Sequence, residues 1–457
     1  MSEKLYLTKY KSLRFTIKRI SPSMVNKSYF DWFNDRTTKK YIEFSPKNIN
    51  DLKKNVIFNL KKKDVLFFGI FFQKKHIGNI KFEKINLNTS SAYFGILIGE
   101  KKWRQKGIAR EVLGKSMDVL YEKFGIFKFF LGVNKENKDA IKLYSNLGFM
   151  KIKSKKKDVI NQKMFKNLLK SKIVIGTAQF GSQYGINNNQ KKISNLEIKK
   201  IKNYALKNNI NSFETAQSYG NAESRLGILN MKNLSVITKI KGLNQEYDQM
   251  KIYALIKDSL KKLKLKQVFG LMIHDAKDLQ GSNGLKIFHF LKTLKKKKII
   301  KNIGVAVYDL DELSKLTKKF KFDIISIPCS IFDRRFLKSK IVVKLKKLNT
   351  KIYARSIFLQ GLLLMKHKNI PNYFYKWNNH FLKLDKLSNQ EKMSKLEFCI
   401  NFVISNPLID KVIIGCDNII QFKQIVNINF KKNFYLKNHF KINDKKLLNP
   451  SKWQIRN

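Results

Sequence analysis

The chain has 457 residues, of which 43% are hydrophobic and 28% charged, and its formal net charge is +61. This length predicts two domains, no apolar run approaches the roughly 20 residues of a membrane span, and no secretory signal follows Met1. Cys329, Cys399 and Cys416 lie far apart, so we expect a cytoplasmic protein with reduced thiols and without a membrane anchor, disulfide framework or metal site.

The positive charge is dispersed rather than clustered. The longest lysine run is Lys295 to Lys298, and most lysines occupy the polar positions of amphipathic segments such as residues 196–202. A clustered charge of this size would favour nucleic acid or an anionic surface. The dispersal instead indicates solvated helix faces, and the enrichment in Lys, Asn, Ile and Phe fits an A/T-rich genome. We therefore expect no specific nucleic-acid partner.

The first part of the chain predicts a mixed α/β domain. Alternation predicts a strand at residues 13–17, and an amphipathic helix follows at 23–33. A second helix is expected at 49–60. Three neighbouring strands then predict an antiparallel meander, at residues 65–72, 76–83 and 92–99.

A helix-start motif follows the last of these strands. Residues Trp103 to Ala109 precede a long helical pattern that ends near Glu122. Small residues at a helix start let an anion such as a pyrophosphate approach the free N–H groups. The spacing Arg104-x-x-Gly107-x-Ala109 resembles the acetyl-CoA loop of the GNAT acetyltransferases. The resemblance implies that these three residues bind the pyrophosphate of acetyl-CoA.

A second motif strengthens this resemblance. A strand at 127–133 is followed by Asn137, Tyr144 and Leu147-Gly148-Phe149, as in the family. The resemblance implies that Asn137 lies near the cofactor arm and that Tyr144 protonates the departing CoA thiolate. The alternatives are a helix N-cap for Asn137 and a core aromatic for Tyr144. We expect a GNAT α+β domain over residues 1–168. Its segments 31–35 and 77–79 look most like acetyltransferases that act on amino-sugar nucleotides or protein N-termini.

The rest of the chain, residues 171–457, predicts a (β/α)8 TIM barrel. Eight apolar strands alternate with helical patterns, which is the signature of this fold. The expected strands are residues 173–177, 211–214, 235–239, 270–274, 303–307, 324–327, 351–355 and 412–415.

Ionisable residues follow three of these strands. Glu214, Lys239 and His274 each end an apolar run, and Tyr219 lies in a Tyr-Gly turn five residues after Glu214. Side chains at such strand ends converge on one rim of a barrel and often carry catalysis. This order resembles the aldo-keto reductases, over about Ile173 to Val426. The resemblance implies that Tyr219 is the proton donor, Lys239 lowers the pKa of its phenol, Glu214 polarises Lys239 and His274 orients the substrate oxygen.

Two positions depart from the family pattern, which usually has Asp at the position of Glu214 and often Asn at that of Ser330. The extra methylene of Glu214 shifts the carboxylate by roughly 1.5 Å, and a misplacement of about 1 Å can lower a rate ~10²-fold. The resemblance places the cofactor rim at Ser356, Gln360, Gly361, Gly415 and Asn418. Asp417 would repel the 2′-phosphate of NADPH unless Lys423 compensates, so NADPH and NADH both stay open.

These resemblances together predict a bifunctional enzyme, an acetyl-CoA-dependent N-acetyltransferase fused to an NAD(P)H-dependent reductase. The expected substrates are small molecules, an amino sugar or keto sugar carried on a nucleotide, in surface-glycan or nonulosonic acid synthesis. One alternative is a protein N-terminal acetyltransferase whose barrel is catalytically silent and serves as a binding module. Another is a ribosome-associated acetyltransferase drawn to RNA by its charge. The oligomeric state is left open.

Overall fold

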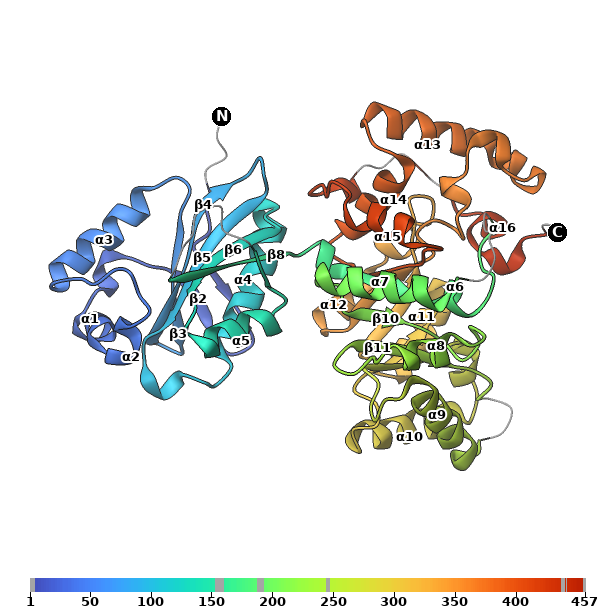
Figure 1. Cartoon of the computed structure of the whole chain (residues 1–457), viewed down its shortest axis with the longest axis horizontal. Coiled ribbons are helices and arrows are strands. Elements are labelled where there is room, and N and C mark those ends of the chain that lie inside the picture. Colours follow the sequence, from blue (N-terminus) through green and yellow to red (C-terminus); the bar gives the residue numbers. More distant parts are fainter. Residues whose placement is uncertain are drawn as a thin grey trace. The chain divides into compact units, whose positions relative to one another are not determined.

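The computed structural model describes residues 5–152, 160–186, 193–243, 247–436, 440 and 442–454. The chain divides into two compact units, Met1–Ser171 and Lys172–Asn457. We call them the N-terminal unit and the barrel unit (Figure 1).

The N-terminal unit is built on one sheet with the strand order β1-β2-β3-β4-β5-β6-β8-β7. The predicted meander is confirmed, because β3, β4 and β5 pair antiparallel, whereas β5 and β6 pair in parallel. The strands are β1 (Lys9–Lys11), β2 (Thr16–Arg19), β3 (Leu66–Phe72), β4 (Lys75–Asn86), β5 (Ser91–Ile98), β6 (Lys128–Asn134), β7 (Met150–Lys151) and β8 (Asn161–Asn167).

Helices cover both faces of this sheet. One core joins the sheet to α4 and α5 through residues such as Phe68 and Val112, and a second core joins it to α1 and α3 through Phe67 and Trp32. Phe67 and Phe68 face opposite cores because successive side chains of a strand alternate between its faces. The helices are α1 (Lys27–Asn34), α2 (Arg36–Lys39), α3 (Ile49–Lys61), α4 (Ile108–Phe124) and α5 (Lys138–Asn146).

The barrel unit is a closed barrel of eight parallel strands, in the order β10 to β16 and then β9. The predicted barrel is confirmed, and each strand begins and ends within one residue of its expected bounds. Its interior is filled by apolar side chains that include Val174, Ile237, Met272 and Tyr353. The strands are β9 (Ile173–Gly176), β10 (Ser212–Glu214), β11 (Ser235–Ile240), β12 (Gly270–Ile273), β13 (Ile303–Ala306), β14 (Ile324–Pro328), β15 (Lys351–Arg355) and β16 (Lys411–Ile414).

Helices wrap the outside of these strands (Figure 1). Within the described residues, the helices of the barrel unit are α6 (Ala178–Gly181), α7 (Asn195–Lys207), α8 (Ala222–Ile228), α9 (Gln249–Leu263), α10 (Gly284–Lys296), α11 (Leu310–Lys319), α12 (Lys340–Lys347), α13 (Asn378–Gln390), α14 (Lys395–Ile404), α15 (Ile419–Val426) and α16 (Lys445–Leu448). Among the helices of the described residues, none is long and apolar enough to cross a bilayer.

Candidate active site

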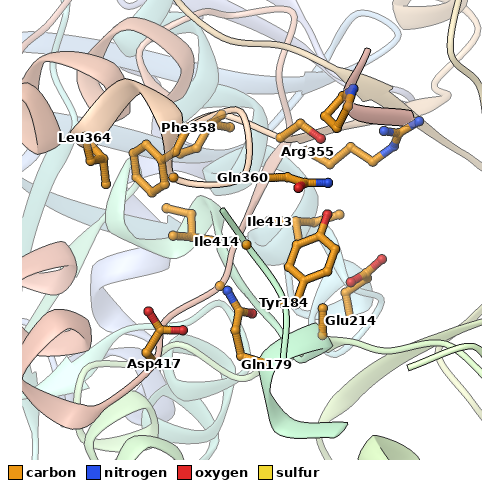
Figure 2. Close-up of a pocket in the computed structure, with 18 of the residues that line it drawn as sticks. Gln179, Tyr184, Glu214, Arg355, Phe358, Gln360, Leu364, Ile413, Ile414 and Asp417 are labelled. Carbon is orange, nitrogen blue, oxygen red and sulfur yellow. The ribbon is translucent and has the colours of Figure 1, made fainter. Parts of the chain in front are cut away.

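A cavity of roughly 750 Å³ opens at the carboxyl ends of the barrel strands. It brings together eight of the residues predicted from sequence: Glu214, Tyr219, Lys239, His274, Ser356, Gln360, Gly361 and Gly415. Figure 2 shows its lining, with Glu214 and Asp417 among the labelled side chains. Asn418 is not part of this lining, and its side chain instead accepts a hydrogen bond from the Gln421 N–H at the start of α15.

Three of these side chains form one buried network. The Lys239 ammonium donates a hydrogen bond to the Tyr219 hydroxyl over 2.8 Å, and it forms an ion pair with the Glu214 carboxylate. The side chains of Lys239 and Glu214 are only 3% and 4% exposed. The longer carboxylate side chain therefore reaches the lysine that the sequence pattern assigns to it.

The Tyr-Gly turn is held by close backbone packing. A Cβ at Gly181 would lie 1.6 Å from the Tyr219 carbonyl oxygen, and Gly220 has a φ of +57°, in the left-handed region. Only glycine fits without strain at either position. These two glycines fix the backbone that carries the Tyr219 side chain.

Burial has the largest effect on the pKa values of the network. The sequence resemblance implies that Lys239 lowers the pKa of Tyr219, but burial raises the pKa of Tyr219 above its ordinary value. Burial, and after it the positive charge of Arg355, lower the pKa of Lys239. The physical reason is that water does not solvate the buried phenol; Tyr184 raises its pKa further, and the positive charge of Arg355 only partly opposes this.

His274 lies beside the network as a neutral imidazole. Its ring centroid is 6.2 Å from that of Tyr219, and its Nδ1 lies 3.2 Å from the Ser218 hydroxyl oxygen. Burial, followed by the charges of Lys239 and Arg355, lowers the pKa of His274 to about 3. The ring can therefore form hydrogen bonds at neutral pH without carrying a charge.

This pKa gives the first testable prediction. A group with a lowered pKa of about 3 stays deprotonated above roughly pH 4, whereas an ordinary histidine titrates near 6.5. We expect the carbonyl-reduction rate constant, kcat, to show no imidazole titration between pH 5 and 8. The measurement is the pH profile of the wild type beside that of His274→Gln. An inflection near pH 6.5 that His274→Gln removes would contradict the prediction.

The loop after β15 has a strained backbone. Ser356, Leu359 and Gln360 have positive φ values of 59°, 46° and 55°, and Gly361 follows with 95°. A non-glycine residue in such a region costs on the order of 1–3 kcal/mol, and such residues cluster at ligand sites. The Ile186 N–H donates to the Gln360 carbonyl over 3.1 Å, which ties this loop to the segment after α6. The predicted cofactor rim is thus a rigid, strained loop on the cavity wall.

The end of the last strand carries an acidic group. Gly415 packs against Gln179 so closely that a Cβ there would lie 2.4 Å from the Gln179 Oε1. Asp417 lines the cavity, and burial raises the pKa of its carboxyl. The Lys423 ammonium lies over the Tyr204 ring, 5.9 Å from its centroid, and Lys423 is not among the residues that line the cavity.

Several lining residues were not predicted from the sequence. Arg355 and Tyr308 line the cavity next to the buried network, and Tyr184 lies between Gln360 and Glu214 in Figure 2. Arg355 is the last residue of β15, much as Lys239 lies next to the end of β11 and His274 follows β12, so the same strand-end pattern could have identified it. Tyr184 and Tyr308 lie in loops and give no such signal.

In the N-terminal unit, strands β5 and β6 separate near the predicted acetyl-CoA loop. They pair only from Ser91 to Tyr93, although β5 continues to Ile98 and β6 continues to Asn134. Beyond these pairs the two facing edges keep backbone groups that an extended amide chain can bind. This opening could not be read from the sequence.

The predicted acetyl-CoA loop lies at the start of α4. Gly107 is its N-cap with a φ of +75°, and Gln105 is also left-handed at +59°. A Cβ at Gly107 would have only the Arg14 Nη2 within 4 Å, at 3.9 Å, so the space above it is open. Ala109 lies in the first turn of α4. The loop therefore presents the free N–H groups of a helix start to an accessible space.

The Arg104 side chain is fully engaged inside the unit. Its Nε donates to the Ile98 carbonyl and its Nη2 to Thr38 Oγ1 and the Gly99 carbonyl. Its Nη1 donates to Asp35 Oδ2 over 2.6 Å and to Thr37 Oγ1 over 2.7 Å. Because an arginine has five N–H donors, none is left for a ligand in this arrangement. Arg104 thus joins the start of α2 to the end of β5.

The remaining two predicted residues lie at the start of α5 and within it. The Asn137 side chain caps the helix by accepting from the Ala140 N–H, the alternative considered from sequence. Tyr144 is 8% exposed and packs edge-on against Phe94, with centroids 5.8 Å apart. Burial raises the pKa of Tyr144 to about 12, so its hydroxyl keeps its proton at neutral pH.

Comparison with known proteins found a family model that matches each unit. The model of the acetyltransferase (GNAT) domain matches residues 14–150. Spermidine N(1)-acetyltransferase of Vibrio cholerae is 33% identical over 78 residues, which cover 17% of this chain and 44% of that protein. The chain thus spans less than half the length of this curated relative.

Solved structures resemble each unit at low sequence identity. Spermidine N-acetyltransferase from Vibrio cholerae, in complex with CoA and spermine, is 21% identical with a TM-score of 0.31, and the match covers 34% of this chain and 95% of that one. An aldo-keto reductase from Bacillus halodurans is 16% identical with a TM-score of 0.47, covering 57% of this chain and 88% of that one. The model of the aldo/keto reductase family matches residues 172–441, more than half of the 457 residues, and the chain belongs to that family.

Proposed function

We propose that the chain is a bifunctional enzyme that reduces a carbonyl compound with NAD(P)H in its barrel unit and transfers an acetyl group from acetyl-CoA to an amine in its N-terminal unit. The observation that carries the proposal is the buried contact between the Tyr219 hydroxyl and the Lys239 ammonium, which pairs with Glu214. A phenol held by a buried ammonium in a cavity can donate a proton as a carbonyl is reduced.

Each residue of the buried network has its own role in the proposed carbonyl reduction. The cofactor would supply the hydride. Tyr219 donates its proton from Oη to the carbonyl oxygen, and Lys239 stabilises the phenolate that this leaves. Glu214 favours the charged form of Lys239, which burial opposes. If Ser218 donates to the Nδ1 of His274, the Nε2–H of the neutral ring is left to donate to the carbonyl oxygen.

The cavity fits a nicotinamide cofactor, and its charges favour NADH. The strained loop of residues 356–361 and the close packing of Gly415 against Gln179 supply a preformed wall. Asp417 lies on this wall, whereas the Lys423 ammonium that could offset it lies over Tyr204. A carboxylate at this point repels the 2′-phosphate of NADPH and can accept from a ribose hydroxyl.

For the N-terminal unit, the loop of residues 104–109 and the open edges of β5 and β6 support an acetyl-CoA site. The loop amides would hold the pyrophosphate, and the strand edges would pair with the amides of the pantetheine arm. Tyr144, which keeps its proton at neutral pH, would protonate the departing thiolate. Since its five donors are engaged, Arg104 would act by fixing this loop rather than by touching the cofactor.

The acceptor has two candidates. An amino-sugar nucleotide is the first, since reduction and N-acetylation are both steps by which keto sugars and amino sugars are modified in surface-glycan synthesis. A polyamine is the second, favoured by the curated spermidine acetyltransferase relative. Acetylation of spermidine and of nucleotide-linked amino sugars, measured side by side, decides between them.

A panel assay tests the reductase proposal. NADH and NADPH consumption is measured with keto sugars, simple aldehydes and ketones, using the full chain. Turnover of at least one carbonyl compound is expected. Cofactor binding without any turnover would favour the alternative that the barrel is a silent binding module.

Substitutions of Glu214 give the second prediction. Glu214→Asp keeps the negative charge beside Lys239 and restores the family's shorter side chain, so we expect unchanged or higher activity. Glu214→Gln removes the charge, and we expect a loss of about 10- to 100-fold, as is typical when a charged hydrogen bond worth ~1.5–3 kcal/mol is removed. In a Tyr219→Phe background both changes should have no effect, because the residues act on one proton transfer. Equal rates for Glu214→Gln and the wild type would contradict this role.

A further inference from the structure

Arg355 places a positive charge beside the catalytic network of the barrel. It is the last residue of β15 and lines the same cavity as Tyr219, Lys239 and His274. Its guanidinium lies over the Tyr308 ring, 4.2 Å from the centroid, and its Nη2 donates to the Val307 carbonyl over 2.9 Å. These two contacts fix the guanidinium plane at the cavity wall.

Most of its hydrogen-bonding capacity is unused. The bond from Nη2 is the one hydrogen bond that the Arg355 side chain makes within the part of the chain that the structure describes. A guanidinium has five N–H donors in a planar fork that matches carboxylate and phosphate geometry. The other donors of Arg355 are therefore available to a ligand.

The charges of the cavity leave Arg355 without a carboxylate partner. Among its described lining residues, Lys239 is paired with Glu214, and the Lys395 ammonium is held by Asp385 and the Met365 carbonyl. The remaining carboxylate, Asp417, lies at the other end of the cavity from Arg355 in Figure 2. A partly buried cation without a carboxylate partner is costly unless an anion joins it.

We propose that Arg355 binds an anionic group of the substrate, a carboxylate or a phosphate, so that the reductase acts on carbonyl compounds carrying a negative charge close to the reacting carbon. This inference rests on the proposed reduction of a carbonyl in the same cavity. Because Arg355, Tyr219 and His274 line one cavity, a substrate that contacts all three carries its negative charge near its carbonyl group. An uncharged keto compound would form no ion pair with the Arg355 guanidinium.

The test compares matched substrates in the wild type and in Arg355→Met, which keeps most of the apolar length but not the charge. Pyruvate is paired with butane-2,3-dione, and glyceraldehyde 3-phosphate with glyceraldehyde, so the two pairs separate carboxylate from phosphate. We expect Arg355→Met to lower kcat/KM for the preferred anionic member about 10- to 100-fold, the usual effect of losing a charge-assisted hydrogen bond. Because the charge of Arg355 also acts on Lys239 and His274, the uncharged partner reports that shared effect, and the loss for the anionic member is taken relative to it.

The affinity for an anionic ligand can be measured without any catalytic turnover. Calorimetry with lactate and with glycerol 3-phosphate, in the presence of NADH, should show binding to the wild type that Arg355→Met weakens about 10-fold or more. If Arg355→Met weakens anion binding but the wild type reduces no carbonyl compound, the anion site is supported and the proposed reductase function is wrong. Equal affinities in the two proteins would overturn the inference.

Two controls separate an anion site from a cofactor contact and from a general effect of charge. Lys351→Met removes the same charge from the opposite end of β15, where Lys351 pairs with Asp410, and should leave anion preference unchanged. The affinity for NADH alone is measured in Arg355→Met. If that affinity falls as much as the anion affinity, the guanidinium serves the cofactor and the inference is wrong.

Discussion

Replacing Tyr219 with Phe leaves NAD(P)H affinity unchanged and lowers carbonyl reduction by ~10²–10⁴-fold, the usual range for a positioned acid. The change removes one oxygen atom, which is the atom that accepts the hydrogen bond from Lys239 at 2.8 Å. Burial raises the pKa of this phenol, so the hydroxyl is protonated at neutral pH, and the Lys239 ammonium stabilises the phenolate that the proton transfer leaves. The measurements are cofactor affinity by fluorescence and kcat by cofactor oxidation.

A folding control accompanies this variant. The substitution removes a partner from the buried Lys239, so some loss of stability is expected, and thermal unfolding shows whether the barrel remains folded at the assay temperature. Tyr353→Phe serves as a matched control, because Tyr353 is also buried in the barrel but does not line the cavity. It should keep the wild-type rate. A folded Tyr219→Phe protein that reduces carbonyls as fast as the wild type would show that Tyr219 is not the proton donor.

Replacing Gly107 with Glu abolishes acetyl-CoA binding in the N-terminal unit. The added side chain would fill the open space above the loop amides and set a carboxylate where the pyrophosphate would bind. The left-handed φ of +75° adds strain of about 1–2 kcal/mol for any residue with a Cβ. A loss of more than about 100-fold in affinity is expected, since two like charges in contact repel by several kcal/mol.

The matched control lies further along α4, beyond its first turn. A Cβ at Gly114 would also meet no heavy atom within 4 Å, so Gly114→Glu adds the same charge to the same helix without strain. It should retain acetyl-CoA affinity within about threefold, because the dipole effect of a helix start falls off within its first turn. Wild-type affinity in a folded Gly107→Glu protein would refute the assignment of the loop.

The barrel could be predicted closely because its strands are short apolar runs, several of which stop at an ionisable residue. Glu214, Lys239 and His274 stand at such stops, and the structure brings them to one cavity as parallel strand ends require. Arg355 follows the same rule, but no sequence motif singles it out. Strand β1 was not predicted because Lys9-Tyr10-Lys11 is too short and too charged to show a pattern.

Other features depend on distant parts of the chain and could not be predicted. Three of the five donors of Arg104 are satisfied by Asp35, Thr37 and Thr38, more than 60 residues earlier in sequence. The strained loop after β15 uses Ser356, Leu359 and Gln360 in conformations that sequence rules assign to glycine. The pKa of Tyr219 depends on how completely the folded barrel excludes water, which strand patterns do not report.

One experiment tests both that the barrel transfers a hydride from the cofactor to a carbonyl carbon and that Tyr219 donates the proton. The full chain is incubated with reduced cofactor that carries deuterium at both C4 positions and with a carbonyl compound that it reduces, and the alcohol is examined by mass spectrometry. We predict one deuterium on the former carbonyl carbon with the wild type, and ~10²–10⁴-fold less labelled alcohol with Tyr219→Phe under the same conditions. Alcohol without deuterium, or equal labelling by the two proteins, would contradict the account of the barrel as a reductase that uses Tyr219.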